Sequence, residues 1–217
     1  MKLCGCVNEK TVDKVIETAN SSEADMIEHR IDYMEQLHKL DNLYTTINKP
    51  VIATNRKADE GGHKLQDEKQ RINTLIAAIR SGCKLVDIEL SAEKKAVIEH
   101  AKKNNCRVIV SFHDFEMTPD EKTLKEIMLR QKESGDFGKI ATTPKTIEDC
   151  HRVLNMVLEA KKIGFPMIAF CMGELGKFTR ITSLLYGAPF MYASIKETNA
   201  PGQLNIKEMK DILEVLG

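Results

Sequence analysis

The chain has 217 residues, and its 32 basic and 32 acidic side chains give a formal net charge of zero. No long block of one charge sign occurs, which argues against nucleic acid or an anionic membrane as a partner. No apolar run reaches the ~20 residues that a membrane span needs. The six cysteines form no Cys-x-x-Cys pair, and this usage favours reduced thiols in a cytoplasmic protein.

Short apolar segments rich in β-branched residues recur along the chain, and charged stretches of helical periodicity separate them. The predicted strands are Leu3–Val7, Asp25–Arg30, Pro50–Asn55, Leu85–Leu90, Arg107–Phe112, Phe137–Ala141, Pro166–Cys171 and Phe190–Ser194. The clearest helical stretches are Thr11–Ala19, Leu65–Ile79, Ala92–Lys103, Asp120–Lys132, Lys145–Lys162 and Ile206–Leu216.

Residues that are typical of helix starts and helix ends support these boundaries. Thr118 precedes Pro119 and Thr143 precedes Pro144, which predicts a cap and a first turn for two helices. Gly82 and Gly164 follow helices and precede strands, where a left-handed cap is expected.

Eight strands, each followed by a helical segment, predict a closed (β/α)8 TIM barrel of the α/β class. A doubly wound open sheet is the alternative. No linker or repeat divides the chain, so we expect residues 1–217 to form a single catalytic domain.

Charged residues gather where the predicted strands end. They are Glu28 and Arg30 on strand two, Arg56 after strand three, Asp87 and Glu89 on strand four, His113 after strand five and Lys139 at the end of strand six. In such a barrel, the carboxyl ends of the strands carry the catalytic groups. We therefore expect these side chains to converge on one site.

Lys139 is the most informative of them, because a lysine flanked by apolar strand residues is costly to bury. Burial favours the neutral amine, and such lysines form Schiff bases with carbonyl substrates. The alternative is a lysine whose head reaches solvent at the strand end.

No motif for other chemistry is present. The chain has no His-x-His pair, no Gly-x-Ser-x-Gly elbow and no glycine-rich phosphate loop, so we expect neither a metal nor a cofactor. The remaining interpretation is work on a carbonyl compound by lysine and histidine.

Seven ordered motifs resemble the type I 3-dehydroquinate dehydratase family. They are Glu28-His29-Arg30 with Asp32, Arg56 with Glu60-Gly61-Gly62, Asp87-Ile88-Glu89-Leu90, Ser111-Phe112-His113-Asp114-Phe115, Lys139-Ile140-Ala141, Met172-Gly173 to Arg180, and Ala200-Pro201-Gly202-Gln203. Two positions depart from the family pattern: Thr179 and Asn199 stand where the family usually has serine.

The resemblance implies a lyase of the shikimate pathway that converts 3-dehydroquinate to 3-dehydroshikimate and water. It implies a Schiff base on Lys139 and His113 as general acid and base, with arginines close to the lysine. The substrate-binding set that it implies is Glu28, Arg30, Arg56, Arg180, Asn199 and Gln203, and the supporting set is Glu60, Asp87, Glu89 and Met172. A homodimer follows only from the resemblance.

Two further hypotheses stay open. One is another class I Schiff-base barrel enzyme, similar to an aldolase. Enzymes of that kind usually bind a phosphate group of the substrate, and this sequence has no phosphate loop. The other is a non-catalytic binding protein that kept the barrel.

Overall fold

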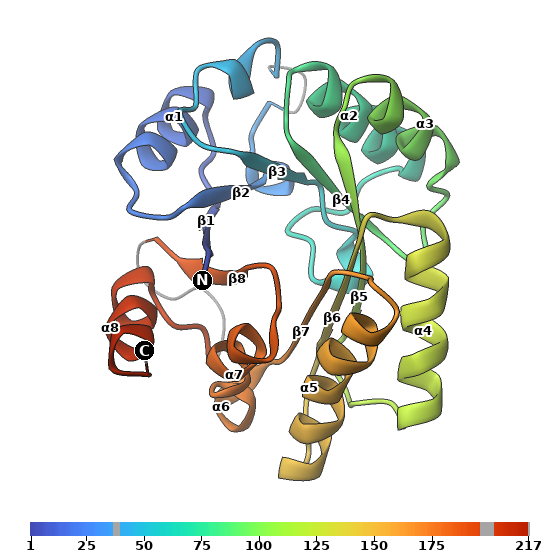
Figure 1. Ribbon diagram of the computed structural model, residues 1–217. Helices are drawn as coiled ribbons and strands as arrows, with labels where there is room; N and C mark the ends of the chain where they lie inside the picture. Colours follow the sequence, from blue (N-terminus) through green and yellow to red (C-terminus); the bar gives the residue numbers. More distant parts are fainter. Residues whose placement is uncertain (37–39, 196–201, 217) are drawn as a thin grey trace.

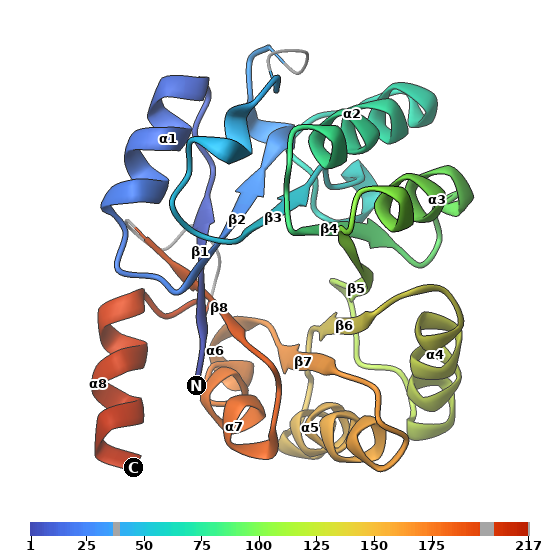
Figure 2. The same ribbon diagram turned by 45° about the horizontal axis from the view of Figure 1, so that its top comes forward.

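The computed structural model describes residues 1–36, 40–195 and 202–216. Eight parallel strands form one nearly closed barrel, and the helices lie around its outside (Figures 1 and 2). The hydrogen-bonded order is β7-β6-β5-β4-β3-β2-β1-β8, and the predicted TIM barrel is confirmed. The strands are β1 (Leu3–Val7), β2 (Met26–Arg30), β3 (Val51–Thr54), β4 (Leu85–Glu89), β5 (Arg107–Asp114), β6 (Phe137–Thr142), β7 (Met167–Cys171) and β8 (Met191–Ser194).

The helices follow the predicted periodicity closely, with one exception. They are α1 (Val12–Ser21), α2 (Glu68–Arg80), α3 (Lys95–Lys103), α4 (Glu121–Ser134), α5 (Ile147–Lys162), α6 (Gly173–Gly176), α7 (Thr179–Tyr186) and α8 (Ile206–Leu216). Between β2 and β3 the described residues form only two short 3₁₀ turns, Ile31–Tyr33 and Leu43–Thr45, so the expectation of a helix after every strand was wrong there. Within the described part of the chain, every helix is too short or too polar to cross a bilayer.

The two predicted helix starts lie a few residues too early. The N-cap of α4 is Asp120, whose side chain accepts a hydrogen bond from the Thr123 amide. The N-cap of α5 is Thr146, which forms a reciprocal capping box with Asp149. A proline fixes one backbone angle, but the residue that supplies the capping oxygen decides where the helix begins.

Both glycines predicted to leave their helices in a left-handed conformation do so. Gly82 has φ of 95° and Gly164 has φ of 65°. Each allows the chain to turn back into the following strand.

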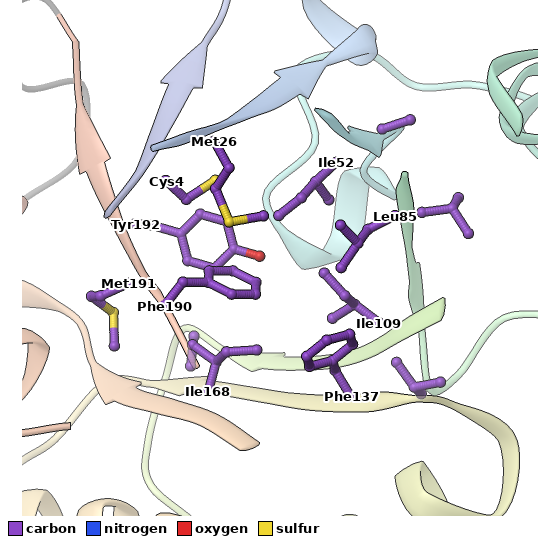
Figure 3. Packing of buried hydrophobic residues seen from close by; sticks show 14 of the residues in the cluster. Cys4, Met26, Ile52, Leu85, Ile109, Phe137, Ile168, Phe190, Met191 and Tyr192 are labelled. Carbon is purple, nitrogen blue, oxygen red and sulfur yellow. The ribbon is translucent and has the colours of Figure 1, made fainter. Parts of the chain in front are cut away.

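The barrel interior is layered, since every second residue of a strand faces inward. The amino-terminal layer is apolar, and Cys4, Met26, Ile52, Leu85, Ile109, Phe137, Ile168 and Phe190 fill it (Figure 3). Two residues further along the same strands stand Glu28, Asp87, Ser111 and Lys139, all buried. The apolar layer closes the bottom of the barrel and forces the polar layer toward the carboxyl ends.

The capping box of α5 gives a stability prediction. Thr146→Ala removes the hydroxyl that accepts from the Asp149 amide, so urea denaturation should show a loss of about 1 kcal/mol in the free energy of unfolding. Thr74→Ala is the control: Thr74 lies on the exposed side of α2 and bonds only the Gln70 carbonyl, so its change should stay within about 0.5 kcal/mol. Equal losses in both variants would contradict the assigned cap.

Candidate active site

One cavity of about 460 Å³ lies among the carboxyl ends of the strands. Most of the predicted site residues line it: Glu28, Arg30, Arg56, Glu60, His113, Lys139, Met172, Arg180 and Gln203. Asp87 and Glu89 do not line the cavity, but they are buried and form ion pairs with residues that do. Asn199 lies outside the described residues.

Arg56 holds together the buried charges below the cavity. Its guanidinium lies 3.0 Å from Asp87 Oδ1 and 2.9 Å from Glu89 Oε1, and it donates to Ser111 Oγ at 2.7 Å. Burial alone would raise the pKa of Asp87, but the positive charges of Arg56 and Lys139 outweigh burial and hold that pKa well below its ordinary value. Asp87 is therefore a fixed negative charge.

A second arginine, which the sequence did not mark as part of the site, completes this network. Arg71 on α2 is almost fully buried and pairs with Glu89 Oε2 at 2.7 Å and with Glu68 Oε2 at 2.8 Å. It also donates to the Asn55 carbonyl. Glu89 is thus held between two arginines from different elements, and its carboxylate supports the position of Arg56.

Lys139 is the third residue of β6, which continues to Thr142. The predicted range Phe137–Ala141 agrees to within one residue, but the placement of Lys139 at the strand's end was wrong. It is 5% exposed, and its Nζ lies 3.2 Å from Asp87 Oδ2 and 3.7 Å from Glu28 Oε1. The Tyr192 ring centroid is 4.1 Å from the same nitrogen. The nearest groups are therefore two carboxylates and an aromatic face, where the sequence suggested neighbouring arginines.

His113 lies on β5, two residues beyond Ser111, the residue in register with Lys139. Its Nδ1 is 3.0 Å from Glu60 Oε2, and Ser91 donates to the other Glu60 oxygen at 2.9 Å. Burial, together with Arg56 and Lys139, lowers the pKa of His113 well below 6.5. An ionised Glu60 can only accept, so Nδ1 then carries the proton and Nε2 keeps a free lone pair.

Two glycines let the segment after β3 fold down over the cavity. Gly61 has φ of 85°, and a Cβ there would lie 2.6 Å from the Phe115 ring. A Cβ on Gly62 would lie 2.2 Å from the Arg56 carbonyl oxygen. Only glycine fits both positions, and this close packing is what brings Glu60 to His113.

Arg180 differs from the other arginines of the cavity. Arg30 pairs with Asp32 at 2.7 Å and Arg56 with Asp87 and Glu89, whereas no carboxylate in the described part of the chain pairs with Arg180. Its guanidinium lies 4.3 Å from the Phe170 ring centroid, and Nε donates to the Gly202 carbonyl. Burial without a compensating anion lowers the pKa of Arg180 to about 10, so this cation favours an anionic ligand.

Gln203 and Cys6 lie close together in the wall of the cavity. Gln203 Nε2 lies 3.8 Å from Cys6 Sγ, and the thiol donates to Glu28 Oε2 at 3.3 Å. Thr179, one of the two departures from the family pattern, points elsewhere: its hydroxyl donates to the Gly176 carbonyl and accepts from the Cys171 amide. Thr179 therefore fixes the start of α7 and its neighbour Arg180.

Several residues of the cavity were not predicted from the sequence. They are Cys6, Asn8, Tyr33, Gly61, Phe115, Ala141, Thr143, Phe170, Gly173 and Tyr192. Strand alternation marks four of them, because Cys6, Ala141, Phe170 and Tyr192 lie two residues after the interior positions Cys4, Lys139, Ile168 and Phe190.

A metal site was not expected from the sequence. Among the residues that the structure describes, no group of three or more histidine, cysteine, aspartate or glutamate side chains could hold a metal ion. The absence of a metal requirement stays a prediction. All six cysteines are free thiols.

Comparison with known proteins agrees with this site. Residues 3–217 match the model of the family described as type I 3-dehydroquinase. The chain is 38% identical to the 3-dehydroquinate dehydratase of Methanothermobacter thermautotrophicus over 94% of this chain and 92% of that protein. It is 36% identical to the enzyme of the same name from Methanopyrus kandleri, over 99% of this chain and 98% of that protein.

A solved structure is similar as well. The type I 3-dehydroquinate dehydratase of Clostridium difficile, crystallised with covalently modified comenic acid, superimposes with a TM-score of 0.90 at 28% identity. The alignment covers 99% of this chain and 91% of that one. Fold, cavity and full-length similarity lead to one conclusion: the chain belongs to the type I 3-dehydroquinase family of enzymes.

Proposed function

We propose that this protein dehydrates 3-dehydroquinate to 3-dehydroshikimate, a step of the shikimate pathway, through an imine on Lys139 with His113 as general base and acid. The observation that carries the proposal is a buried lysine amine in the same cavity as a histidine whose pKa is lowered. The relatives named as 3-dehydroquinate dehydratases support the reaction. The covalently modified ligand of the Clostridium difficile enzyme supports covalent chemistry in the family.

The first steps follow from the position of Lys139. Its amine attacks the C3 carbonyl carbon, and the carbonyl oxygen leaves as water, which forms the imine. The protonated imine withdraws electrons from C2 and acidifies the C2 proton. Asp87 and Glu28, at 3.2 and 3.7 Å from Nζ, favour a positive charge on this nitrogen, so they stabilise the protonated imine.

His113 moves the protons. Its lowered pKa keeps the imidazole neutral near pH 7, so Nε2 can take the C2 proton while the electron pair moves to the imine nitrogen. The imidazolium then gives a proton to the C1 hydroxyl, which leaves as water. Glu60 stabilises the imidazolium through Nδ1 at 3.0 Å. A second water hydrolyses the conjugated imine, releasing product and Lys139.

The remaining polar groups bind the substrate. Arg180 is suited to the substrate carboxylate through a planar fork, because no carboxylate in the described residues neutralises it. Glu28, Arg30, Arg56 and Gln203 line the cavity and can bind the ring hydroxyls. We also propose a cytoplasmic location, a homodimer, and a lid formed by residues 56–66, whose Gly61 and Gly62 can absorb large backbone changes.

Covalent capture tests the role of Lys139. Borohydride added with substrate should reduce the imine and leave a stable adduct on Lys139, located by peptide mass spectrometry. Lys139→Arg keeps the charge without the nucleophile, so it should form no adduct. Lys125→Arg changes an exposed lysine of α4 and should label like the parent. An active enzyme that carries the reduced adduct on another residue, or carries no adduct at all, would contradict the assignment of the imine to Lys139.

The role of His113 is tested by its removal. His113→Ala should lose about 10²–10⁴-fold in kcat, yet borohydride should still capture substrate on Lys139, because imine formation uses the lysine amine. In the parent enzyme, the acid limb of kcat/KM should lie below pH 6.5, since the lowered pKa keeps the base unprotonated until the pH falls through it. Near-parental kcat in His113→Ala would assign the proton transfer to another residue, with Glu60 as the next to test.

Arg180 should contribute more to substrate binding than Asn199. Arg180→Ala removes the buried cation and should cost about 1.5–3 kcal/mol in kcat/KM, mainly through KM, as for hydrogen bonds to a charged group. Asn199→Ala should cost about 0.5–1.5 kcal/mol for one ordinary hydrogen bond, and Asn199→Ser should be nearly neutral. Steady-state kinetics compares the three variants. Equal losses for the two alanine variants would make Asn199 a principal ligand group.

A further inference from the structure

Tyr192 lines the cavity but takes no part in the reaction above. It lies on β8 with its ring in the barrel interior beside Phe190 and Cys4 (Figure 3). The side chain is 4% exposed, and its hydroxyl has no hydrogen-bond partner among the described residues. A buried phenol without a partner is costly, and the contacts that the structure shows for this side chain are made by its ring.

The ring faces the reacting nitrogen. Its centroid is 4.1 Å from Lys139 Nζ, within the range where the negative face of an aromatic ring attracts a cation, and the attraction is stronger where water is excluded. We propose that the Tyr192 ring stabilises the positive charge of the protonated imine on Lys139 and is thus a catalytic group. This inference rests on the proposed Schiff-base function.

The change in hydrogen-bonding capacity at the nitrogen gives the ring this role. A lysine ammonium has three N–H donors, enough for Asp87 and Glu28 together. The protonated imine keeps a single N–H, so it can donate to only one of these carboxylates at a time. Attraction to a ring face requires no N–H, and it therefore persists when the ammonium becomes an iminium.

The phenol stays neutral throughout. Burial, reinforced by the negative charges of Glu28 and Asp87, raises the pKa of the Tyr192 hydroxyl well above 10. The same cavity offers an internal comparison, because Arg180 lies over Phe170 at 4.3 Å. The Phe170 ring contacts a binding cation, whereas the Tyr192 ring contacts the nitrogen that reacts.

The sharpest test replaces residue 192 by phenylalanine and then by mono-, di- and trifluorophenylalanine. Fluorine weakens the negative face of the ring and nearly preserves its shape. The value of kcat should fall with each added fluorine, by about 5- to 30-fold in total over the series. The alkaline limb of the kcat profile should move down by about one pH unit, because weaker stabilisation of the charged imine lowers its pKa.

Three conventional variants separate this effect from loss of packing. Tyr192→Leu removes the ring and should lower kcat at least as much as the most fluorinated ring does. Tyr192→Phe keeps the ring and should have a kcat within about threefold of the parent value. Phe190→Leu removes a ring that packs edge-on against Tyr192 at 5.6 Å but does not line the cavity, so it should lower thermal stability without moving the alkaline limb. Phe170→Leu should raise KM more than it lowers kcat.

The outcomes are distinguishable. If the parent enzyme leaves no borohydride adduct on Lys139, the proposed function fails and this inference fails with it. If the adduct forms throughout and kcat is flat across the fluorinated series, the role of Tyr192 alone is overturned. The fluorinated proteins keep the shape of the ring, so they decide the question even if Tyr192→Leu does not fold.

Discussion

The buried carboxylates of Asp87 and Glu89, two residues apart on β4, are the constraint on which the site depends. Removing such charges from water costs several kcal/mol each unless partners with good geometry compensate them. The partners come from three other elements: Arg56 after β3, Lys139 on β6 and Arg71 on α2. Because the Lys139 amine pairs with Asp87, the same network holds this amine in the barrel interior.

This pairing divides the cations of the cavity into two kinds. Arg30 and Arg56 already have carboxylate partners within the chain, so they contribute position and hydrogen bonds more than net attraction. Arg180 has none among the described residues, and the lowered pKa records the cost of its burial. An anionic substrate would remove that cost. In the proposed reaction, the substrate carboxylate therefore gains binding energy at Arg180 because it neutralises this buried cation.

The sequence predicted the barrel and the charged residues at its strand ends because both follow from local rules. Alternation along a strand identifies inward-facing residues, and all charged residues predicted from strand ends and described by the structure are in or beside the cavity. Long-range partners could not be read in this way. Arg71 looks like an ordinary charged residue of an amphipathic helix until tertiary packing places it against Glu89, and the proximity of carboxylates to Lys139 depends on which strands face each other across the barrel.

The relative height of Lys139 and His113 along the barrel axis is a feature that only the structure shows. Lys139 is in register with Ser111, and His113 with Ala141, so the lysine starts one inward-facing layer below the histidine. Nucleophile and base therefore reach one cavity from neighbouring strands at two heights. In the proposed reaction the two groups act on adjacent carbons, C3 and C2. The lysine can hold C3 from below while the histidine, fixed by Glu60 from the segment above, approaches the proton on C2.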